Sequence, residues 1–144
     1  MPQIDFYILH TPVRSERDRL ACRLVDKAWH QGYRVYIHTP SLIQAKQLDD
    51  LLWTFKDTSF LPHDIYPDVL SSSAPIRIGY TDQVCETMEV LVNLTVTVPA
   101  FFAQAKRIAE IVDDTAMARE TGRDRYRFYQ KTADNVLKVH EIYR

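Results

Sequence analysis

Apolar residues along the chain alternate between the spacing of strands and the spacing of helices. Residues 4–9 are rich in β-branched and aromatic side chains and predict a buried strand. Residues 15–31 have apolar positions every three to four residues, which predicts an amphipathic helix capped by Ser15 and ended by Gly32. Residues 34–38 predict a second buried strand. The beginning of the chain therefore indicates a strand–helix–strand unit.

The rest of the chain continues the alternation around one irregular stretch. Thr39 and Pro40 are typical of a helix start, and the second helix is predicted to run to about Trp53. Prolines interrupt residues 54–75, which we interpret as an elaborated loop. The remaining predictions are strands over 76–80 and 90–94, a helix over 99–112, a last helix over 115–135 interrupted near Gly122, and an unassigned tail over 136–144.

Alternating strands and helices favour an α/β fold with an open, largely parallel sheet covered by helices on both faces. A length of 144 residues fits one domain, and no composition shift marks a boundary within residues 1–144. A net charge of -1 argues against a globally basic nucleic-acid coat. No apolar run is long enough to cross a membrane, and the first residues lack a signal-peptide pattern, so we expect a cytoplasmic protein.

Glycine and cysteine usage excludes two kinds of site. The glycines are Gly32, Gly79 and Gly122, which cannot form a glycine-rich phosphate-binding loop. Cys22 and Cys85 have no metal-binding spacing, and we expect both to be reduced. The sequence therefore predicts no bound nucleotide, no other cofactor and no metal.

Two histidines carry the hypothesis that the chain is an enzyme. His10 and His38 follow the first two predicted strands, and ligands of open α/β sheets bind at the carboxyl ends of strands. The simpler interpretation is that both are hydrogen-bonded loop residues, because no Ser, Cys or carboxylate is spaced to pair with either one as a nucleophile. We favour that interpretation and keep a small-molecule enzyme as an alternative.

An aromatic cluster surrounds the end of the second predicted helix. Trp53, Phe55, Phe60 and Tyr66 lie where the chain becomes irregular, and loops run over the surface. Exposed aromatic residues among polar ones are typical of a protein-binding patch. Alternatively, Trp53 closes the helix against the core and Phe60 packs the loop down. The pattern alone leaves both interpretations open.

A basic stripe lies on the last predicted helix. Arg119, Arg123, Arg127 and Lys131 recur every four residues and share one helix face, with Tyr126 on the same side. This stripe is either a solvated face, partly compensated by nearby acidic residues, or an anion site. Arginines bind carboxylates and phosphates in bidentate fashion, so an acidic peptide or a nucleic-acid backbone is a candidate ligand. A single-stranded DNA binder that stacks bases on Tyr126 is a further alternative.

Several separate runs of residues are similar to one known family, among them Asp-Phe-Tyr in the first predicted strand and Leu-Val-Asn-Leu in the fourth. The matching runs are residues 5–7, 27–29, 32–35, 48–53, 59–63, 74–76, 91–94 and 122–129. Over nearly its whole length the chain thus resembles the chi subunit of bacterial DNA polymerase III holoenzyme, a clamp-loader accessory protein.

The resemblance implies a Rossmann-like fold without nucleotide binding or catalysis. It also implies an adaptor that links the clamp loader to single-stranded DNA-binding protein. In the family one surface binds the psi subunit, where one exists, and its positions match Trp53 and Phe60. A second surface binds the acidic, phenylalanine-ended tail of single-stranded DNA-binding protein. The positions that match this tail pocket are Val112, Arg119, Arg123 and Tyr126.

Overall fold

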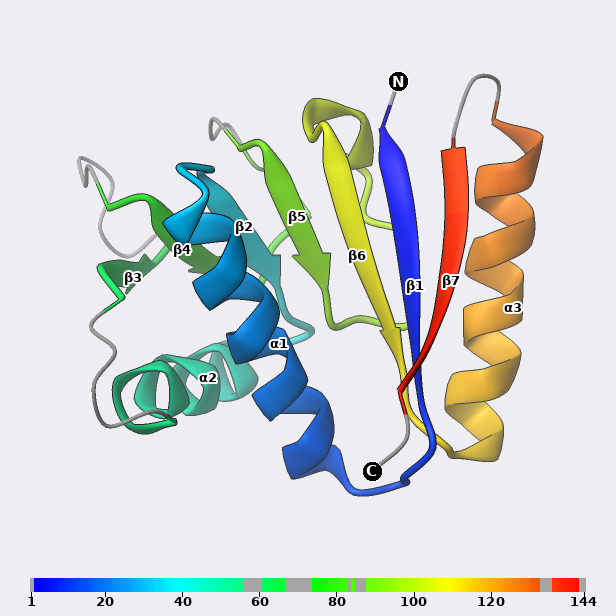
Figure 1. Ribbon diagram of the computed structural model, residues 1–144, viewed down its shortest axis with the longest axis horizontal. Coiled ribbons are helices and arrows are strands. Elements are labelled where there is room, and N and C mark those ends of the chain that lie inside the picture. The colour runs from blue at the N-terminus through cyan, green and yellow to red at the C-terminus, as the bar shows by residue number, and fades with distance from the viewer. Residues whose placement is uncertain are drawn as a thin grey trace.

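The computed structural model describes residues 2–55, 61–66, 74–82, 84, 88–132 and 136–142. In this part of the chain, seven strands form one open sheet in the order β3-β4-β2-β5-β6-β1-β7, and every neighbouring pair is parallel (Figure 1). The predicted α/β class with a parallel sheet is therefore confirmed. The elements are β1 (Gln3–Leu9), α1 (Arg14–His30), β2 (Val35–His38), α2 (Leu42–Thr54), β3 (His63–Ile65), β4 (Ile76–Gly79), β5 (Val90–Asn93), the 3₁₀ helix η1 (Phe102–Gln104), β6 (Arg107–Val112), α3 (Ala116–Lys131) and β7 (Val136–Ile142).

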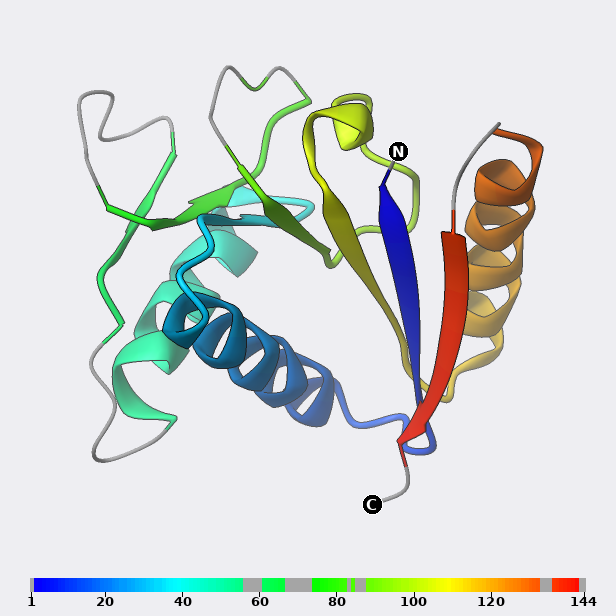
Figure 2. The ribbon, with the colours of Figure 1, turned by 45° about the horizontal axis from the view of Figure 1, so that its top comes forward.

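Helices cover both faces of the sheet, as a parallel sheet requires. Figures 1 and 2 show α1 and α2 on one face and α3 on the other. Two apolar clusters fill the spaces between these layers: Leu9 and Val25 belong to the cluster under α1, whereas Phe6 and Tyr129 belong to the cluster under α3. Successive residues of β1 therefore supply opposite sides of the sheet.

Residues 136–142, which belong to the tail that the sequence left unassigned, form β7, which pairs with β1. Asp5 holds this edge of the sheet together from the middle of β1. Its carboxylate accepts a hydrogen bond from His140 of β7 at 3.0 Å and one from Arg107 of β6 at 3.2 Å. Burial alone raises the pKa of Asp5, but hydrogen bonds from His140, Arg107 and Gln3 outweigh it and lower the pKa below its usual value.

The helix predicted over residues 99–112 is wrong. Only η1 is helical there, and Arg107–Val112 is the strand β6, which lies between β5 and β1. A strand buried on both faces has no polar alternation, and Glu110 inside it imitates the polar position of an amphipathic helix. The alanines before β6 strengthened that false pattern, although Ile108, Ile111 and Val112 are the β-branched residues that strands favour.

Several helix boundaries also differ from the predictions. Helix α1 begins at Arg14 after Val13, without a side-chain cap, and Ser15 lies inside it. Helix α2 is capped by Ser41, whose hydroxyl accepts a hydrogen bond from the backbone N–H of Gln44 at 3.2 Å. The Thr39 hydroxyl instead donates to the carbonyl of Gly79 at 2.9 Å, which ties the ends of β2 and β4 together.

Other local predictions have mixed outcomes. Gly32 ends α1 as expected, with a φ of 87° that favours glycine. Helix α3 runs through Gly122 without interruption. The stretch read as loop contains the short strand β3. Cys22 is buried and unpaired, and burial raises the pKa of its thiol to about 12, whereas Cys85 lies outside the described residues.

Candidate functional site

The basic stripe and the end of β6 meet at a hollow of about 160 Å³ between α3 and the sheet. We call this the α3 hollow. It brings together the four residues Val112, Arg119, Arg123 and Tyr126, which come from two elements. Sequence reasoning missed the other residues of its lining. These are Phe6, Ile8, Gly122 and Val139.

Gly122 allows α3 to approach β6 closely at the α3 hollow. A Cβ atom built on Gly122 would lie 2.8 Å from Cγ2 and 3.3 Å from Cγ1 of Val112. Val112 is buried, and its β-branched side chain has few alternative rotamers. The glycine that the sequence suggested as a helix interruption is therefore a packing residue.

The two arginines of the α3 hollow are held differently. Arg119 donates from Nη2 to the carbonyl of Leu9 at 3.0 Å and forms an ion pair with Asp114 at 3.3 Å, so its guanidinium is oriented by the protein. Arg123 is exposed and has no ion-pair or hydrogen-bond partner among the described residues. Its guanidinium therefore keeps all its donors for a ligand.

Elsewhere in the basic stripe, the positive charge of one residue is balanced by an acidic neighbour. Arg127 forms an ion pair with Asp124 at 3.1 Å on the solvent side of α3, and neither residue lines the α3 hollow. Tyr126 closes the apolar side of the hollow, because its ring packs edge-on against Phe6 with centroids 5.3 Å apart. The α3 hollow thus combines an uncompensated cation with an apolar wall.

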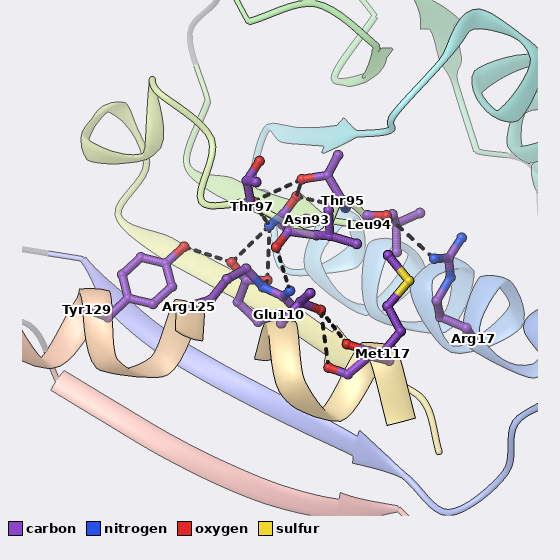
Figure 3. Close-up of polar contacts among 12 residues, drawn as sticks. Arg17, Asn93, Leu94, Thr95, Thr97, Glu110, Met117, Arg125 and Tyr129 are labelled. Carbon is purple, nitrogen blue, oxygen red and sulfur yellow. Dashed lines mark hydrogen bonds and ion pairs between the residues drawn. The ribbon is translucent and has the colours of Figure 1, made fainter. Parts of the chain in front are cut away.

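A buried polar network sets the rotation of α3 on the sheet (Figure 3). Glu110 is completely buried and accepts hydrogen bonds from Arg125 at 2.8 Å, Tyr129 at 2.7 Å and Asn93 at 3.0 Å. Burial raises the pKa of Glu110, and the charge of Arg125 with these hydrogen bonds opposes that rise. Because Arg125 and Tyr129 face Glu110, the adjacent flank of α3, which carries Arg119, Arg123 and Tyr126, lies over β1 and the end of β6.

Trp53 lies at the end of α2, far along the chain from the α3 hollow. It is 50% exposed, and its ring packs against that of His63 with centroids 4.6 Å apart. The His63 side chain is buried and contacts a carboxylate oxygen of Asp49 at 3.2 Å. Trp53 is therefore a supported but exposed aromatic residue, whereas Phe60 lies outside the described residues.

These surfaces can be compared with known proteins. The family model described as DNA polymerase III chi subunit, HolC, matches residues 1–136. The chain belongs to this family. As a chi-family member it has an accessory role in replication by DNA polymerase III, which confirms the resemblance seen in the sequence.

Curated relatives of this chi-family chain are similar over most of their length. The DNA polymerase III subunit chi of Pseudomonas aeruginosa is 35% identical over 131 residues, which cover 91% of each chain. The protein of the same name from Haemophilus influenzae is 27% identical over 85% of each chain. That of Escherichia coli is 24% identical over 94% of this chain and 96% of the relative.

Among solved structures, the crystal structure of T4 UvsW matches with a TM-score of 0.67 at 10% identity. The match covers 96% of the chi-family chain, which spans only 41% of the T4 chain. At this identity the likeness concerns the fold alone.

The histidines of the enzyme alternative do not form one site in the chi-family chain. His10 follows β1 and pairs with Glu141 of β7 at 2.8 Å, whereas His38 ends β2, and β5 and β6 lie between these strands. Within the described ranges, no group of three His, Cys, Asp or Glu residues is arranged to hold a metal ion. Among the helices of the described part, none is long and apolar enough to span a membrane.

Proposed function

We propose that the chain is a non-catalytic adaptor of the replicative polymerase, working in the cytoplasm. In this proposal the α3 hollow binds the acidic, phenylalanine-ended tail of single-stranded DNA-binding protein, and the surface around Trp53 binds a psi subunit where the organism has one. The convergence of Val112, Arg119, Arg123 and Tyr126 on one hollow is the observation that carries the first half.

The chemistry of the α3 hollow suits a peptide that is acidic and ends in an aromatic residue. Arg119 and Arg123 supply guanidinium groups for the terminal carboxylate and acidic side chains. Val112, Phe6 and Val139 supply apolar surface for the phenylalanine ring. Burial of the ring stabilises the complex, while the exposed charges accelerate the encounter and make it sensitive to salt. For so small an interface we expect micromolar affinity, about -8 kcal/mol.

The second half of the proposal rests on the exposure of Trp53. A large aromatic ring that is half exposed and supported by His63 resembles the anchor residues of protein interfaces. Since Trp53 is on α2 and the α3 hollow is on the opposite face of the sheet, both partners have room to bind at once. An adaptor requires that separation.

Fluorescence anisotropy with three labelled ligands tests the tail-binding half. The ligands are the acidic tail peptide, the same peptide without its terminal phenylalanine, and single-stranded DNA of matched charge. We expect the complete peptide to bind best and its truncated form to lose at least about tenfold in affinity, because the apolar wall is left unfilled. If DNA binds better and the phenylalanine has no effect, the surface is an electrostatic DNA patch instead.

A further inference from the structure

A second and larger hollow, which we call the strand-end pocket, lies at the carboxyl ends of the central strands. Its volume is about 530 Å³, within the roughly 300–1,000 Å³ of small-molecule sites. His38 at the end of β2 and Leu94 just after β5 line its floor, and Met117 of α3 lines its rim. The chi-family comparisons and the adaptor proposal leave this pocket unassigned.

The path of the chain makes the strand-end pocket a favourable place for a ligand. After β2 the chain turns through α2 toward β3 and β4, whereas after β5 it turns the other way to β6. Neighbouring strands whose connections leave in opposite directions open a crevice at their carboxyl ends, and α/β proteins bind ligands there. Thr39 and Thr95 continue from the two strands into this crevice.

The pocket has a cationic wall. Arg14 and Arg17 lie in the first turn of α1, whose start has no side-chain cap. Arg17 is held in place by Asp18 at 3.1 Å, and its Nη1 lies 3.5 Å from the carbonyl of Leu94 (Figure 3). Arg14 has no partner among the described residues. A helix start and an unpaired guanidinium together favour an anionic group.

Two buried polar atoms independently indicate that the pocket holds polar chemistry. The His38 side chain lines the pocket and is 4% exposed, yet its Nδ1 has no hydrogen-bond partner among the residues that the structure describes. Oε1 of Gln44, from the first turn of α2, is also buried and has no partner in the described part of the chain. Buried polar atoms are nearly always hydrogen-bonded in native proteins, so two exceptions at one pocket are informative.

Burial lowers the pKa of the His38 imidazole, against the opposing charge of Asp82, and so favours its neutral form. A neutral imidazole offers one donor and one acceptor, which suits hydroxyl and phosphate oxygens equally. Tyr80, Leu94 and Met117 give the lining apolar surface suited to an organic body, and Asp82 adds one carboxylate, whose charge is opposite to that of the two arginines.

We propose that the strand-end pocket binds a phosphate monoester with an organic body of nucleoside size, carried on a free mononucleotide or on the 5′ end of a DNA strand. The scarcity of glycine does not oppose this. A glycine-rich loop is needed to wrap a pyrophosphate with backbone N–H groups, whereas Arg14 and Arg17 hold a single phosphate through side chains.

Isothermal titration calorimetry of the whole chain tests the proposal with thymidine 5′-monophosphate, thymidine and inorganic phosphate. We expect the monophosphate to bind in the sub-millimolar range and thymidine to bind about tenfold more weakly or worse, since it lacks the charge-assisted contacts. Arg14→Ala should weaken the monophosphate about tenfold. Arg19→Ala is the matched control, because Arg19 is exposed on the same helix and does not line the pocket.

Nitrogen-15 NMR of the histidine rings gives a readout that does not depend on substitution. The monophosphate should shift the His38 signals and leave those of His10 unchanged. Arg123→Ala should not alter monophosphate binding, so failure of this proposal is separable from failure of the tail-binding proposal. A 5′-phosphorylated oligonucleotide compared with its 5′-hydroxyl form decides the source of the phosphate.

Four results would overturn the proposal. They are absence of binding by any probe at millimolar concentration, equal binding of thymidine and its monophosphate, equal affinity of Arg14→Ala and the unaltered chain, and His38 signals that do not shift when the monophosphate is added. A preference for the free monophosphate supports a small-molecule site. A preference for the phosphorylated oligonucleotide supports recognition of a DNA end.

Discussion

Nε of Arg125 lies 2.8 Å from Oε1 of Glu110, and both side chains are closed off from solvent. Arg125 also donates from Nη1 to the carbonyl of Val96 at 3.1 Å, so one guanidinium joins α3 to β6 and to the loop after β5. Burying two charges is unfavourable unless each is fully paired. Here Asn93 and Tyr129 donate the further hydrogen bonds that the Glu110 carboxylate needs.

Replacement of Arg125 tests the importance of this pair. Arg125→Met leaves the Glu110 carboxylate buried without its cation, and we expect a loss of about 3–5 kcal/mol in the free energy of unfolding. Urea denaturation followed by circular dichroism measures it. Arg127→Ala is the matched control on the same helix, and its exposed ion pair should contribute no more than about 0.5 kcal/mol. Equal losses for both variants would contradict a special role of the buried pair.

The same variant has a pH signature. The pKa of Glu110 is already raised in the folded protein, and removal of Arg125 raises it further. A raised folded pKa favours folding at low pH and costs stability as the pH rises from the unfolded value near 4.5 through the folded pKa. The loss caused by Arg125→Met should therefore be smaller at acidic than at alkaline pH. A difference that is constant or reversed across that range would show that Glu110 does not titrate this way.

Gly122→Ala should damage both packing and binding at the α3 hollow. Alanine normally favours a helix interior by about 1 kcal/mol over glycine, but its Cβ would lie 2.8 Å from Val112. We expect the cost of overpacking to exceed the gain in helix propensity, with a net loss of about 1–2 kcal/mol in the free energy of unfolding. The double variant with Val112→Ala should recover part of that loss, which a double-mutant cycle measures. Independent, additive effects would show that the two residues do not meet.

The two outer arginines of α3 should differ in peptide binding. Arg123 lines the α3 hollow and is unpaired, so Arg123→Ala should cost about 1.5–3 kcal/mol in affinity for the acidic peptide. Arg127→Ala removes the same charge from a position outside the hollow and should cost far less. Anisotropy titrations at two salt concentrations compare them. Equal effects at both positions would indicate diffuse attraction to the stripe.

Trp53 offers a prediction on the opposite face. Trp53→Ala should weaken psi binding by about 2 kcal/mol or more, as expected for an aromatic anchor. Ile43→Ala is the control, since Ile43 is an apolar residue of the same helix with 70% exposure. Calorimetry with purified psi measures both. A normal complex with Trp53→Ala would remove Trp53 from the interface.

How far the sequence predicts this fold depends on how local each signal is. The strand over residues 4–9 and the helix ended by Gly32 are predicted from the spacing of neighbouring apolar residues, and both are confirmed. Strand β6 was missed because Glu110 interrupts its apolar run, and its partners Arg125 and Tyr129 come 15 and 19 residues later. Local spacing cannot show that Glu110 is a buried residue of a strand, because its partners lie far along the chain.

In the candidate site, too, residues close together in the sequence are predictable and residues far apart are not. Helical spacing placed Arg119, Arg123 and Tyr126 on one face, and the structure brings them together. Phe6 and Val139 complete the α3 hollow because β1 and β7 pair, which joins residues more than 130 positions apart. Residue spacing along one helix carries no information about such a contact. The apolar residues of β7 do not alternate strictly with polar ones, because Val136 and Leu137 are adjacent, so this exposed edge strand carries little signal of its own.

Because the buried Glu110 network sets the position of α3, an exposed residue of this helix can be exchanged without rebuilding the scaffold. Arg123 is exposed, and Arg123→Glu leaves Arg125 and Tyr129 to keep the helix in register. This variant should bind an acidic tail more weakly and a basic tail more strongly. The preference of the chain for a charged peptide would then be changed at one position.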